Sequence, residues 1–411
     1  MTSRRKFLES LSILGLGSQI KPGFSETRVQ FDANNWKDIK KQFAIIQNPI
    51  LNLNSGSGGS MPYPVLDEYV HYTKMFNNDA VYKVKESLSQ EIENIKIRLA
   101  NQLHCFSDEL AFTKNTTESL NTIIWGIPLK ANDEVVVANI DYPYVINALN
   151  QRAQKDQIII NQIDLNLPEL SDEEIIEKYR QAFTYKTKLV VLTMITHREG
   201  QILPVKKITA LAHSMNIEVL VDAAHVLGQL AHTIKDLDCD YYATCMHKWM
   251  NGPLGTGVLF VKKNIIEKLR PPAFPYPESL QSQMDKLDYS GTIAFQKILT
   301  LKSVLDFNDR ITIEKKEKRL KYLTRYWTNA VKKMNGARIY SDISRSCGIA
   351  TLTINGLATK VHQTLIHDHY KINIKKTGYH AKPLFRVSTN IFHDENDLDQ
   401  FIHAIKEITN T

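Results

Sequence analysis

The chain has 411 residues, of which 43% are hydrophobic and 23% are charged. These values are ordinary for a folded protein with a large core, and they exclude a disordered, collagen-like or coiled-coil architecture. No apolar run approaches the roughly 20 residues that span a bilayer, so we expect no stable membrane anchor. The net charge of +7 leaves nucleic acid open as a partner until the charges are located.

The first 25 residues have the features of an export signal. S-R-R-K-F-L at residues 3–8 precedes a short, weakly apolar stretch at residues 11–17. The paired arginines resemble the twin-arginine signal, although Glu9 stands where lysine is usual. We therefore expect residues 1–25 to be a removable leader, the twin-arginine export machinery to be a partner, and the mature protein to be periplasmic. A basic amphipathic helix is the alternative.

From about residue 80 to residue 265, helical patterns alternate with short apolar runs. Helical spacing occurs at Val84–Leu103 and Val205–Ser214. The apolar runs are Glu134–Ala138, Gln157–Ile160, Lys188–Thr193, Ile217–Val221, Tyr241–Thr244 and Gly257–Val261. Such runs between amphipathic helices predict a largely parallel sheet that is covered on both faces. In sheets of this kind, ligands bind beyond the carboxyl ends of the strands.

A proline-rich stretch at residues 271–277 separates this region from a smaller α+β domain. The domain begins with a basic helical stretch, Arg310–Met334, and continues with a strand at Ala350–Ile354 and a helix at Asn396–Ile408. Four apolar residues of the basic stretch should face inward: Leu320, Leu323, Trp327 and Val331. We interpret its lysines and arginines as a solvated face, and a nucleic-acid site is the alternative.

The charge divides between the leader and the rest of the chain. Residues 1–25 contribute +3 and the remainder keeps +4, much of it in the basic helix, so no nucleic-acid partner is expected. We expect four segments: the leader, an N-terminal segment at 26–50 that packs near the small domain, a large domain at 51–290 and a small domain at 291–411.

Four features follow predicted strands or begin a predicted helix. Asp222 follows one strand, Lys248 in M-H-K-W follows another, and Tyr142 in I-D-Y-P follows a third. Thr116 and Thr117 lie at a helix start, where free backbone N–H groups favour a phosphate. Each feature alone has a plain structural explanation, such as a helix cap or an exposed lysine.

Together, the four features match the chemistry of pyridoxal phosphate (PLP). A lysine forms a Schiff base with its aldehyde, and a carboxylate beside the ring nitrogen keeps the pyridinium protonated. A helix start with two hydroxyls holds its phosphate, and an aromatic side chain stacks on its ring. A protein that kept this fold without the cofactor is the alternative.

Other familiar motifs are missing from the sequence. There is no phosphate-binding loop of the form G-x-x-x-x-G-K-[ST], no G-x-S-x-G nucleophile motif and no dinucleotide-binding glycine fingerprint. His367-Asp368-His369 lacks the surroundings of a closed metal site, so we expect no metal. Four irregularly spaced cysteines imply no disulfide framework, although one bridge stays open.

The chain resembles the class V aminotransferase family of fold-type I PLP enzymes from Leu51 to Phe401. The most specific block is V-D-A-A-H-V-L-G followed by M-H-K-W-M-N-G-P-L-G-T-G, which places Lys248 26 positions after Asp222. The resemblance implies an α/β fold with a mostly parallel, seven-stranded type of sheet between helices, plus a smaller α+β C-terminal domain. It also implies a homodimer with shared active sites.

By the same resemblance, Lys248 is the Schiff-base lysine and Asp222 is the partner of the ring nitrogen. The remaining cofactor-binding positions are His225 at the ring hydroxyl, Tyr142 stacked on the ring, and Thr116, Thr117, Cys245 and His247 around the phosphate. Thr292 lies in the segment that reaches the phosphate of the neighbouring subunit. Arg386 matches the arginine that binds the substrate α-carboxylate, and His197 lies near the ring.

Departures from the family pattern reduce the number of reactions that the chain is expected to catalyse. Desulfurases carry a nucleophilic cysteine in a loop that reads T-G-H-H-C-A-Q-P, whereas residues 377–383 read T-G-Y-H-A-K-P. Cys347 lies 39 residues before Arg386, too far to replace that cysteine, so persulfide chemistry is not expected. The D-A-A-H and H-K-W variants resemble the isopenicillin N epimerase branch.

Members of that branch perform epimerisation, C–S cleavage and periplasmic tailoring of peptide siderophores. We expect a PLP-dependent enzyme that acts at the α-carbon of an amino acid or of a peptide that bears one. Lys248 would remove the α-proton as a general base. The sequence does not determine which of these reactions follows.

Overall fold

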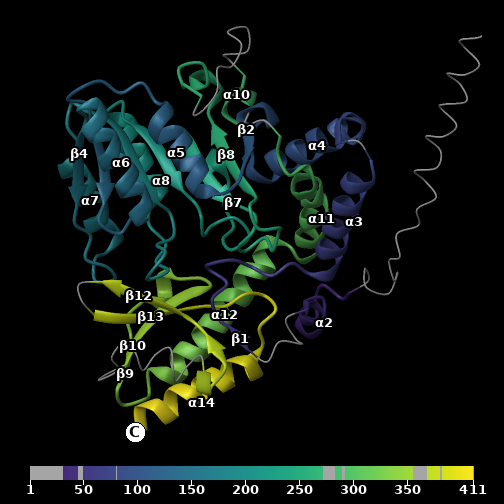
Figure 1. Ribbon diagram of the computed structural model, residues 1–411. Coiled ribbons are helices and arrows are strands. Elements are labelled where there is room, and N and C mark those ends of the chain that lie inside the picture. Colours follow the sequence, from purple (N-terminus) through teal and green to yellow (C-terminus); the bar gives the residue numbers. More distant parts are fainter. Residues whose placement is uncertain are drawn as a thin grey trace, which may run out of the picture.

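The computed structural model describes residues 31–44, 50–79, 81–271, 283–288, 292–354, 368–379 and 382–410. These residues form a large domain around a seven-stranded sheet and a smaller domain around a four-stranded sheet (Figure 1). The predicted leader lies outside the described residues. Within the described ranges, no helix combines the length and apolar character that crossing a bilayer requires.

The large sheet has the strand order β2-β8-β7-β6-β5-β3-β4. Its strands are β2 (Leu110–Thr113), β3 (Glu134–Ala138), β4 (Ile159–Ile163), β5 (Thr187–Thr193), β6 (Glu218–Asp222), β7 (Tyr241–Cys245) and β8 (Gly257–Val261). β8 is antiparallel to both neighbours and the other described pairs are parallel, which confirms the predicted mostly parallel sheet. The sequence pattern missed β2, which has only four residues.

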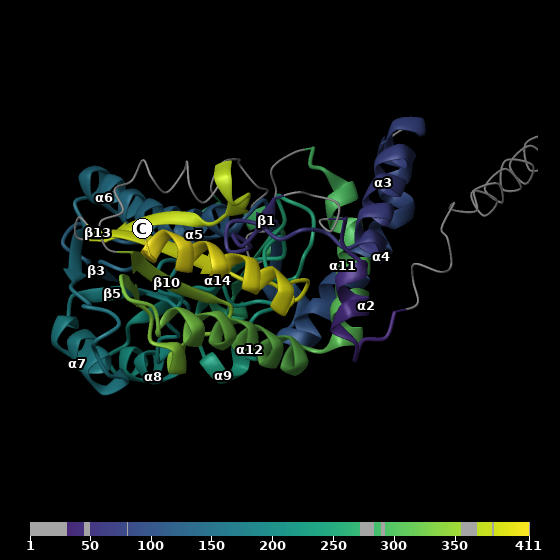
Figure 2. The same cartoon turned by 90° about the horizontal axis from the view of Figure 1, so that it is seen from below.

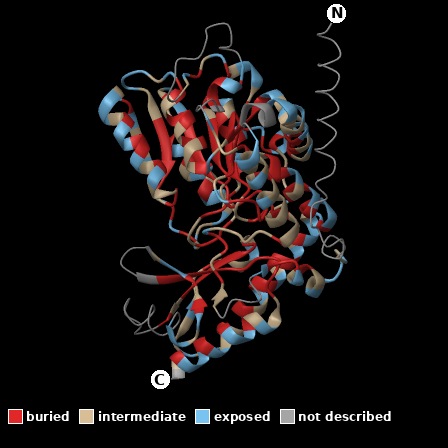
Figure 3. Cartoon of the chain, turned by 45° about the vertical axis from the view of Figure 1, so that its right-hand side comes forward, coloured by how far each residue is buried: buried red, intermediate tan, exposed pale blue. Residues whose placement is uncertain are grey.

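Helices cover both faces of this sheet because alternate residues of each strand point to opposite sides. Val135 and Val137 of β3 pack in the cluster that includes α5 (Thr116–Gly126) and α6 (Pro143–Asp156). Val136 of β3 packs on the other side, in the cluster that includes α7 (Asp172–Ala182) and α8 (Val205–Ser214). Figure 3 shows the strands as a buried layer between these helices, whose outer faces are exposed. The short helix α9 (Ile234–Leu237) also packs beside α8.

Three longer helices pack together beside β2 at the edge of the large domain (Figure 1). They are α3 (Tyr63–Asn78), α4 (Val81–Leu103) and α11 (Phe295–Ile311), and the short α10 (Asp285–Asp288) contacts β2. α11 ends at Ile311, because Thr312 has a φ of +67°, and α12 (Ile313–Val331) begins directly after Thr312. The prediction of one continuous helix from residue 310 was therefore wrong at its start. The four residues predicted to face inward are fully buried, as expected.

The small domain is an antiparallel sheet with helices on one face. Its strand order is β12-β13-β10-β9, and its elements are β9 (Ala337–Ile339), β10 (Ile349–Ile354), β12 (Lys375–Tyr379), β13 (Lys382–Ser388) and α14 (Glu395–Asn410). α12 and α14 lie side by side on the face of this sheet that is turned away from the large domain, as the view from below shows (Figure 2). Trp327 and Phe401 meet edge-to-face in the core between them. The opposite face of the sheet turns toward the large domain.

The N-terminal segments attach to the small domain. β1 (Leu51–Asn52) pairs in parallel with β11 (Ile372–Asn373). Lys40 of α2 (Trp36–Lys41) forms ion pairs with Asp394 and Asp397 at distances of 2.9 and 2.7 Å. The division of the chain at residues 51 and 291 stays a prediction. The contacts of β1 and α2 show that residues near the N-terminus pack against the small domain, which is built mainly from the C-terminal part of the chain.

A buried lysine joins the corner between α11 and α12 to the large domain. Lys316 Nζ donates hydrogen bonds to the backbone oxygen of Trp249, at 2.6 Å, and to the side-chain oxygen of Asn308. Asn308 in turn donates to the backbone oxygen of Met250 at 2.9 Å. These acceptors are uncharged, and burial lowers the pKa of Lys316 to about 7.

This pKa makes the stability of the protein depend on pH. An unfolded lysine has a pKa of about 10.4, so between pH 7 and 10 the unfolded chain binds more protons and the free energy of unfolding rises with pH. Lys316→Met should remove that rise, measured by urea unfolding at pH 7.5 and 9.5. Lys318→Met, at an exposed position of the same helix, is the control. An equal pH dependence in wild type and Lys316→Met would contradict the assignment.

Candidate active site

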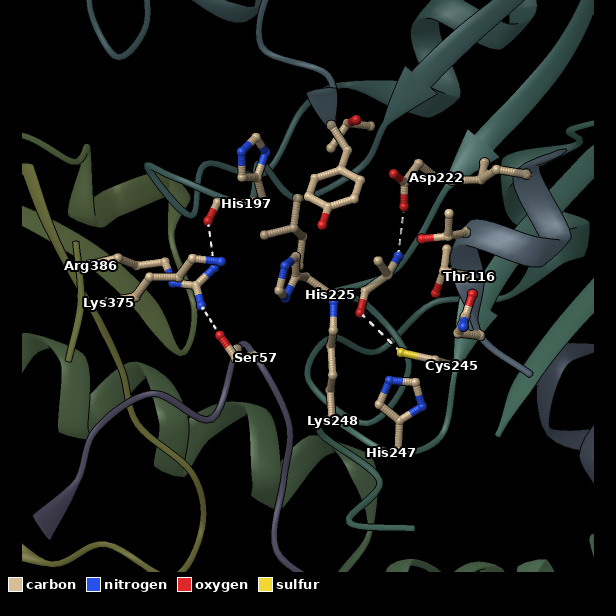
Figure 4. Close-up of a pocket in the computed structure, with 18 residues that line it drawn as sticks. Ser57, Thr116, His197, Asp222, His225, Cys245, His247, Lys248, Lys375 and Arg386 are labelled. Carbon is tan, nitrogen blue, oxygen red and sulfur yellow. Dashed lines mark hydrogen bonds between the residues drawn. The ribbon is translucent and has the colours of Figure 1, made fainter. Parts of the chain in front are cut away.

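A cavity of about 240 Å³ lies between the carboxyl ends of the large-sheet strands and the small sheet (Figure 4). Ten of the residues predicted to form the site line it: Thr116, Thr117, Tyr142, His197, Asp222, His225, Cys245, His247, Lys248 and Arg386. The strand register brings several of them together, because Thr193 of β5 pairs with Asp222 of β6, which pairs with Ala243 of β7. These strands therefore end level with one another at the cavity.

Lys248 lies three residues after β7, in a turn held by the N-terminal loop. The N–H of Gly59 donates to the backbone oxygen of His247 at 2.8 Å. A Cβ atom at Gly59 would lie only 2.0 Å from the backbone oxygen of Lys248. Glycine is therefore required at this position, since any side chain would displace the backbone that carries the lysine.

Asp222 and Lys248 influence each other's charge. Asp222 is buried, and its Oδ1 accepts a hydrogen bond from the N–H of Ala224 at 3.0 Å. Burial raises the pKa of Asp222, while the Ala224 N–H and the Lys248 amine partly oppose the rise. Burial also lowers the pKa of Lys248, although the nearby Cys245 and Asp222 partly compensate. A lysine of lowered pKa is a better nucleophile and base at neutral pH.

The start of α5 forms one end of the cavity. The Asn115 side chain caps the helix by accepting from the N–H of Glu118 at 2.8 Å. The hydroxyl of Thr116 is buried without a hydrogen-bond partner among the described residues. An unpartnered buried hydroxyl is costly, and at a helix N-terminus an anion would satisfy it together with the free backbone N–H groups.

Cys245 and His247 lie near this end. His247 Nδ1 lies 3.0 Å from the backbone oxygen of Thr256, and Cys245 Sγ lies 3.6 Å from that of Ala224. Burial acts to raise the pKa of Cys245, but Lys248 and His247 outweigh it, so the pKa of the thiol is lowered. Burial likewise opposes the rise in the pKa of His247 that Cys245 causes.

Two histidines and a tyrosine form the walls. His225 Nδ1 and His197 Nδ1 are buried and have no partner among the described residues. Burial and neighbouring cations hold the pKa of both imidazoles well below its usual range, so both are neutral at pH 7. The ring of Tyr142 meets that of His197 edge-to-face, with centroids 5.3 Å apart and planes at 84°.

Tyr142 is placed by the preceding aspartate. Asp141 accepts hydrogen bonds from the N–H of Ala138 at 2.7 Å and from the hydroxyl of Thr193 at 2.6 Å. It thereby joins the ends of β3 and β5. Burial raises the pKa of Asp141 to about 7, although these hydrogen bonds oppose the rise.

Arg386 occupies the other end of the cavity, on β13. Its guanidinium donates to the backbone oxygen of His197 at 2.8 Å, to Asn54 Oδ1 at 3.0 Å and to Ser57 Oγ at 3.1 Å. Its Nε has no partner among the described residues, and burial lowers its pKa to about 10. Because the described acceptors are uncharged, the buried cation lacks a neutralising anion.

Sequence reasoning missed three residues at this end of the cavity: Asn54, Ser57 and Lys375. Ser57 and Lys375 line the cavity, and Asn54 and Ser57 accept from Arg386. Asn54 and Ser57 belong to a loop without a recognisable motif. Lys375 reaches the cavity because β12 pairs with β13, and the sequence gives no signal for that register.

One predicted site residue does not line the cavity of this chain. Thr292 is exposed, and the three residues before it lie outside the described residues. Its predicted role at the neighbouring subunit stays a prediction. All four cysteines are free thiols. In the part of the chain that the structure describes, no three His, Cys, Asp or Glu side chains cluster in a way suited to a metal ion.

Known proteins share this architecture and sequence pattern. A probable cysteine desulfurase of Halalkalibacterium halodurans is 24% identical over 91% of this chain and 98% of its own length. The isopenicillin N epimerase of Amycolatopsis lactamdurans is 23% identical over 92% of this chain and 99% of its own. A solved mutant of C-DES, a cystine C–S lyase, with glycine covalently linked to the PLP cofactor, aligns with a TM-score of 0.81 and 18% identity. That alignment covers 90% of this chain and 99% of the other.

The fold and the cavity define a PLP-dependent enzyme of fold type I. The unpartnered hydroxyl of Thr116, the unpartnered Nδ1 of His225 and the carboxylate of Asp222 fit the phosphate, the ring hydroxyl and the ring nitrogen of the cofactor. The model of the aminotransferase class-V family matches residues 51–401, and the chain belongs to that family.

Removing the Thr116 hydroxyl should weaken cofactor binding. Thr116→Val keeps the volume but cannot hydrogen-bond a phosphate, so we expect the dissociation constant for PLP to rise about tenfold. The measurement is a visible-absorbance titration of the cofactor-free enzyme with PLP. Thr116→Ser, which keeps the hydroxyl, is the matched control and should bind like the wild type. Equal affinities for all three proteins would contradict a role in phosphate binding.

Proposed function

We propose that the enzyme removes the α-proton of an amino acid, or of the amino-acid residue of a peptide. The observation that carries the proposal is the buried Arg386, which lacks a neutralising anion and shares one cavity with the Lys248 amine and the Asp222 carboxylate. A substrate α-carboxylate would neutralise the guanidinium, which presents paired N–H groups suited to a carboxylate.

Each group of lining residues would bind a different part of the cofactor. Lys248 would hold the aldehyde carbon, and Asp222 would pair with the ring nitrogen. His225 would contact the ring hydroxyl and Tyr142 the ring face, while Thr116, Thr117, Cys245 and His247 would surround the phosphate. Bound PLP withdraws electrons from the α-carbon of an attached amino group and so acidifies its proton.

The protein then supplies orientation and a base. Arg386 fixes the carboxylate, which sets the position of the α-carbon relative to Lys248. The lowered pKa of Lys248 leaves more of its amine neutral and able to accept the α-proton. The neutral His197, whose backbone oxygen accepts from Arg386, adds no positive charge beside the reacting carbon.

Epimerisation is the reaction we favour, and C–S cleavage is the second candidate. Cys245 is the only cysteine among the described lining residues, and it lies at the phosphate end rather than beside Arg386. Residues 377–383 contain no cysteine to accept sulfur. Relatives named as an isopenicillin N epimerase and as a cystine C–S lyase support these two candidates.

The test is exchange of the α-proton in D₂O. The PLP-loaded enzyme is incubated with a panel of L-amino acids and short peptides. We expect deuterium at the α-carbon of at least one compound, with loss of optical purity for an epimerase, or a keto acid with ammonia and a sulfur product for a lyase. Lys248→Ala should abolish exchange, and Arg386→Lys should lower kcat/KM at least about tenfold. No exchange with any amino compound would contradict the proposal.

We also propose that residues 1–25 direct export by the twin-arginine route to the periplasm. The paired Arg4 and Arg5 before an apolar stretch support this. Changing both arginines to lysine should leave the enzyme in the cytoplasmic fraction, with Lys21→Arg as the control of unchanged charge. Identical distribution of the two variants between periplasm and cytoplasm would contradict export by this route.

We further propose a homodimer in which Thr292 contacts the phosphate site of the neighbouring subunit. Its support is that Thr292 is exposed and lies outside the cavity of its own chain. Sedimentation of the purified enzyme as a monomer would contradict this arrangement.

A further inference from the structure

Lys375 shares a face of the small sheet with Arg386. β12 and β13 are antiparallel, and Lys375 is the direct register partner of Arg386. Side chains that stand opposite each other in this way project to the same face of a sheet. Both line the cavity, and Figure 4 shows Lys375 beside Arg386 at the end away from Thr116.

Two like charges directly opposite each other destabilise a sheet. No ion pair of Lys375 or Arg386 with a carboxylate occurs among the described residues, and Asp222 is the one acidic residue of the described lining. Burial, Arg386 and Lys248 together lower the pKa of Lys375.

Lysines on edge strands commonly point to solvent, where they prevent strand-to-strand association. β12 is an edge strand, and both Lys375 and Lys376 are exposed. Lys376 is opposite Phe385, whose side chain is in the hydrophobic core on the other side of the sheet. Lys375 is on the opposite face, where it lines the cavity beside Arg386, so protection of the edge alone does not account for its position.

The cofactor and the α-carboxylate leave Lys375 without an assigned partner. The phosphate belongs to the α5 end of the cavity, and the α-carboxylate belongs to Arg386. We propose that the substrate carries a second anionic group, such as a side-chain carboxylate, sulfonate or phosphate, and that Lys375 binds it. This rests on the proposed function, because it assigns Arg386 to the α-carboxylate, and it narrows the substrate to acidic amino acids or to peptides with a second acid near the reacting residue.

The test measures binding of compounds that lack an amino group. The PLP-loaded enzyme is titrated calorimetrically with straight-chain dicarboxylates from succinate to pimelate and with their monomethyl esters, which keep one charge. We expect at least one dicarboxylate to bind about tenfold more tightly than its own ester, the factor that one charged hydrogen bond supplies. Lys375→Gln should remove this preference and Lys375→Arg should retain it.

Lys376→Gln is the matched control, because it removes the same charge from the adjacent residue on the opposite face. It should keep the full preference. Equal binding of every dicarboxylate and its ester by the wild type, or a preference that survives in Lys375→Gln, would overturn the proposal. These compounds have no α-amino group, so their binding is independent of proton exchange in D₂O, and the two proposals can fail separately.

Discussion

The hydrogen bonds of the buried Arg386 hold together three segments that are distant in sequence. The guanidinium belongs to the small sheet, one acceptor is the backbone of His197 beyond β5, and two others, Asn54 and Ser57, belong to the N-terminal loop. The group that is assigned to the substrate carboxylate is therefore also a structural link between the domains. In the function proposed above, the geometry of the cleft and the binding of the substrate depend on the same side chain.

The electrostatics of the cavity follow from its burial. Desolvation opposes every charged form, which keeps His197 and His225 neutral and lowers the pKa values of Lys248 and Arg386. A PLP site needs both neutral and charged groups. A neutral amine is required to accept a proton, and a cation is required to attract a carboxylate. Burial favours the neutral amine of Lys248 although Asp222 opposes this effect. Arg386 has no carboxylate partner among the described residues, so its charge is available to an anion.

Much of the large domain could be predicted from the sequence because continuous apolar runs identify buried parallel strands. Asp222 and Lys248 were recognisable because they follow such runs directly, at a spacing that the family shares. Lys375 was not recognisable, since its place beside Arg386 depends on antiparallel register, which local residue patterns do not encode. The break at Thr312 was missed because threonine carries no helix-ending signal in the sequence, and its positive φ is seen only in the structure.

The close approach of Gly59 to Lys248 matters for redesign of this enzyme. The N-terminal loop packs directly against the turn that carries the lysine, and Gly59 is the residue in contact with the backbone of His247 and Lys248. Loop libraries aimed at new substrates have to keep glycine at position 59, and Ser57, two residues earlier, contacts Arg386. The contact with Arg386 and the placement of Lys248 thus depend on two positions of one short segment, so a change in this loop affects both ends of the cavity.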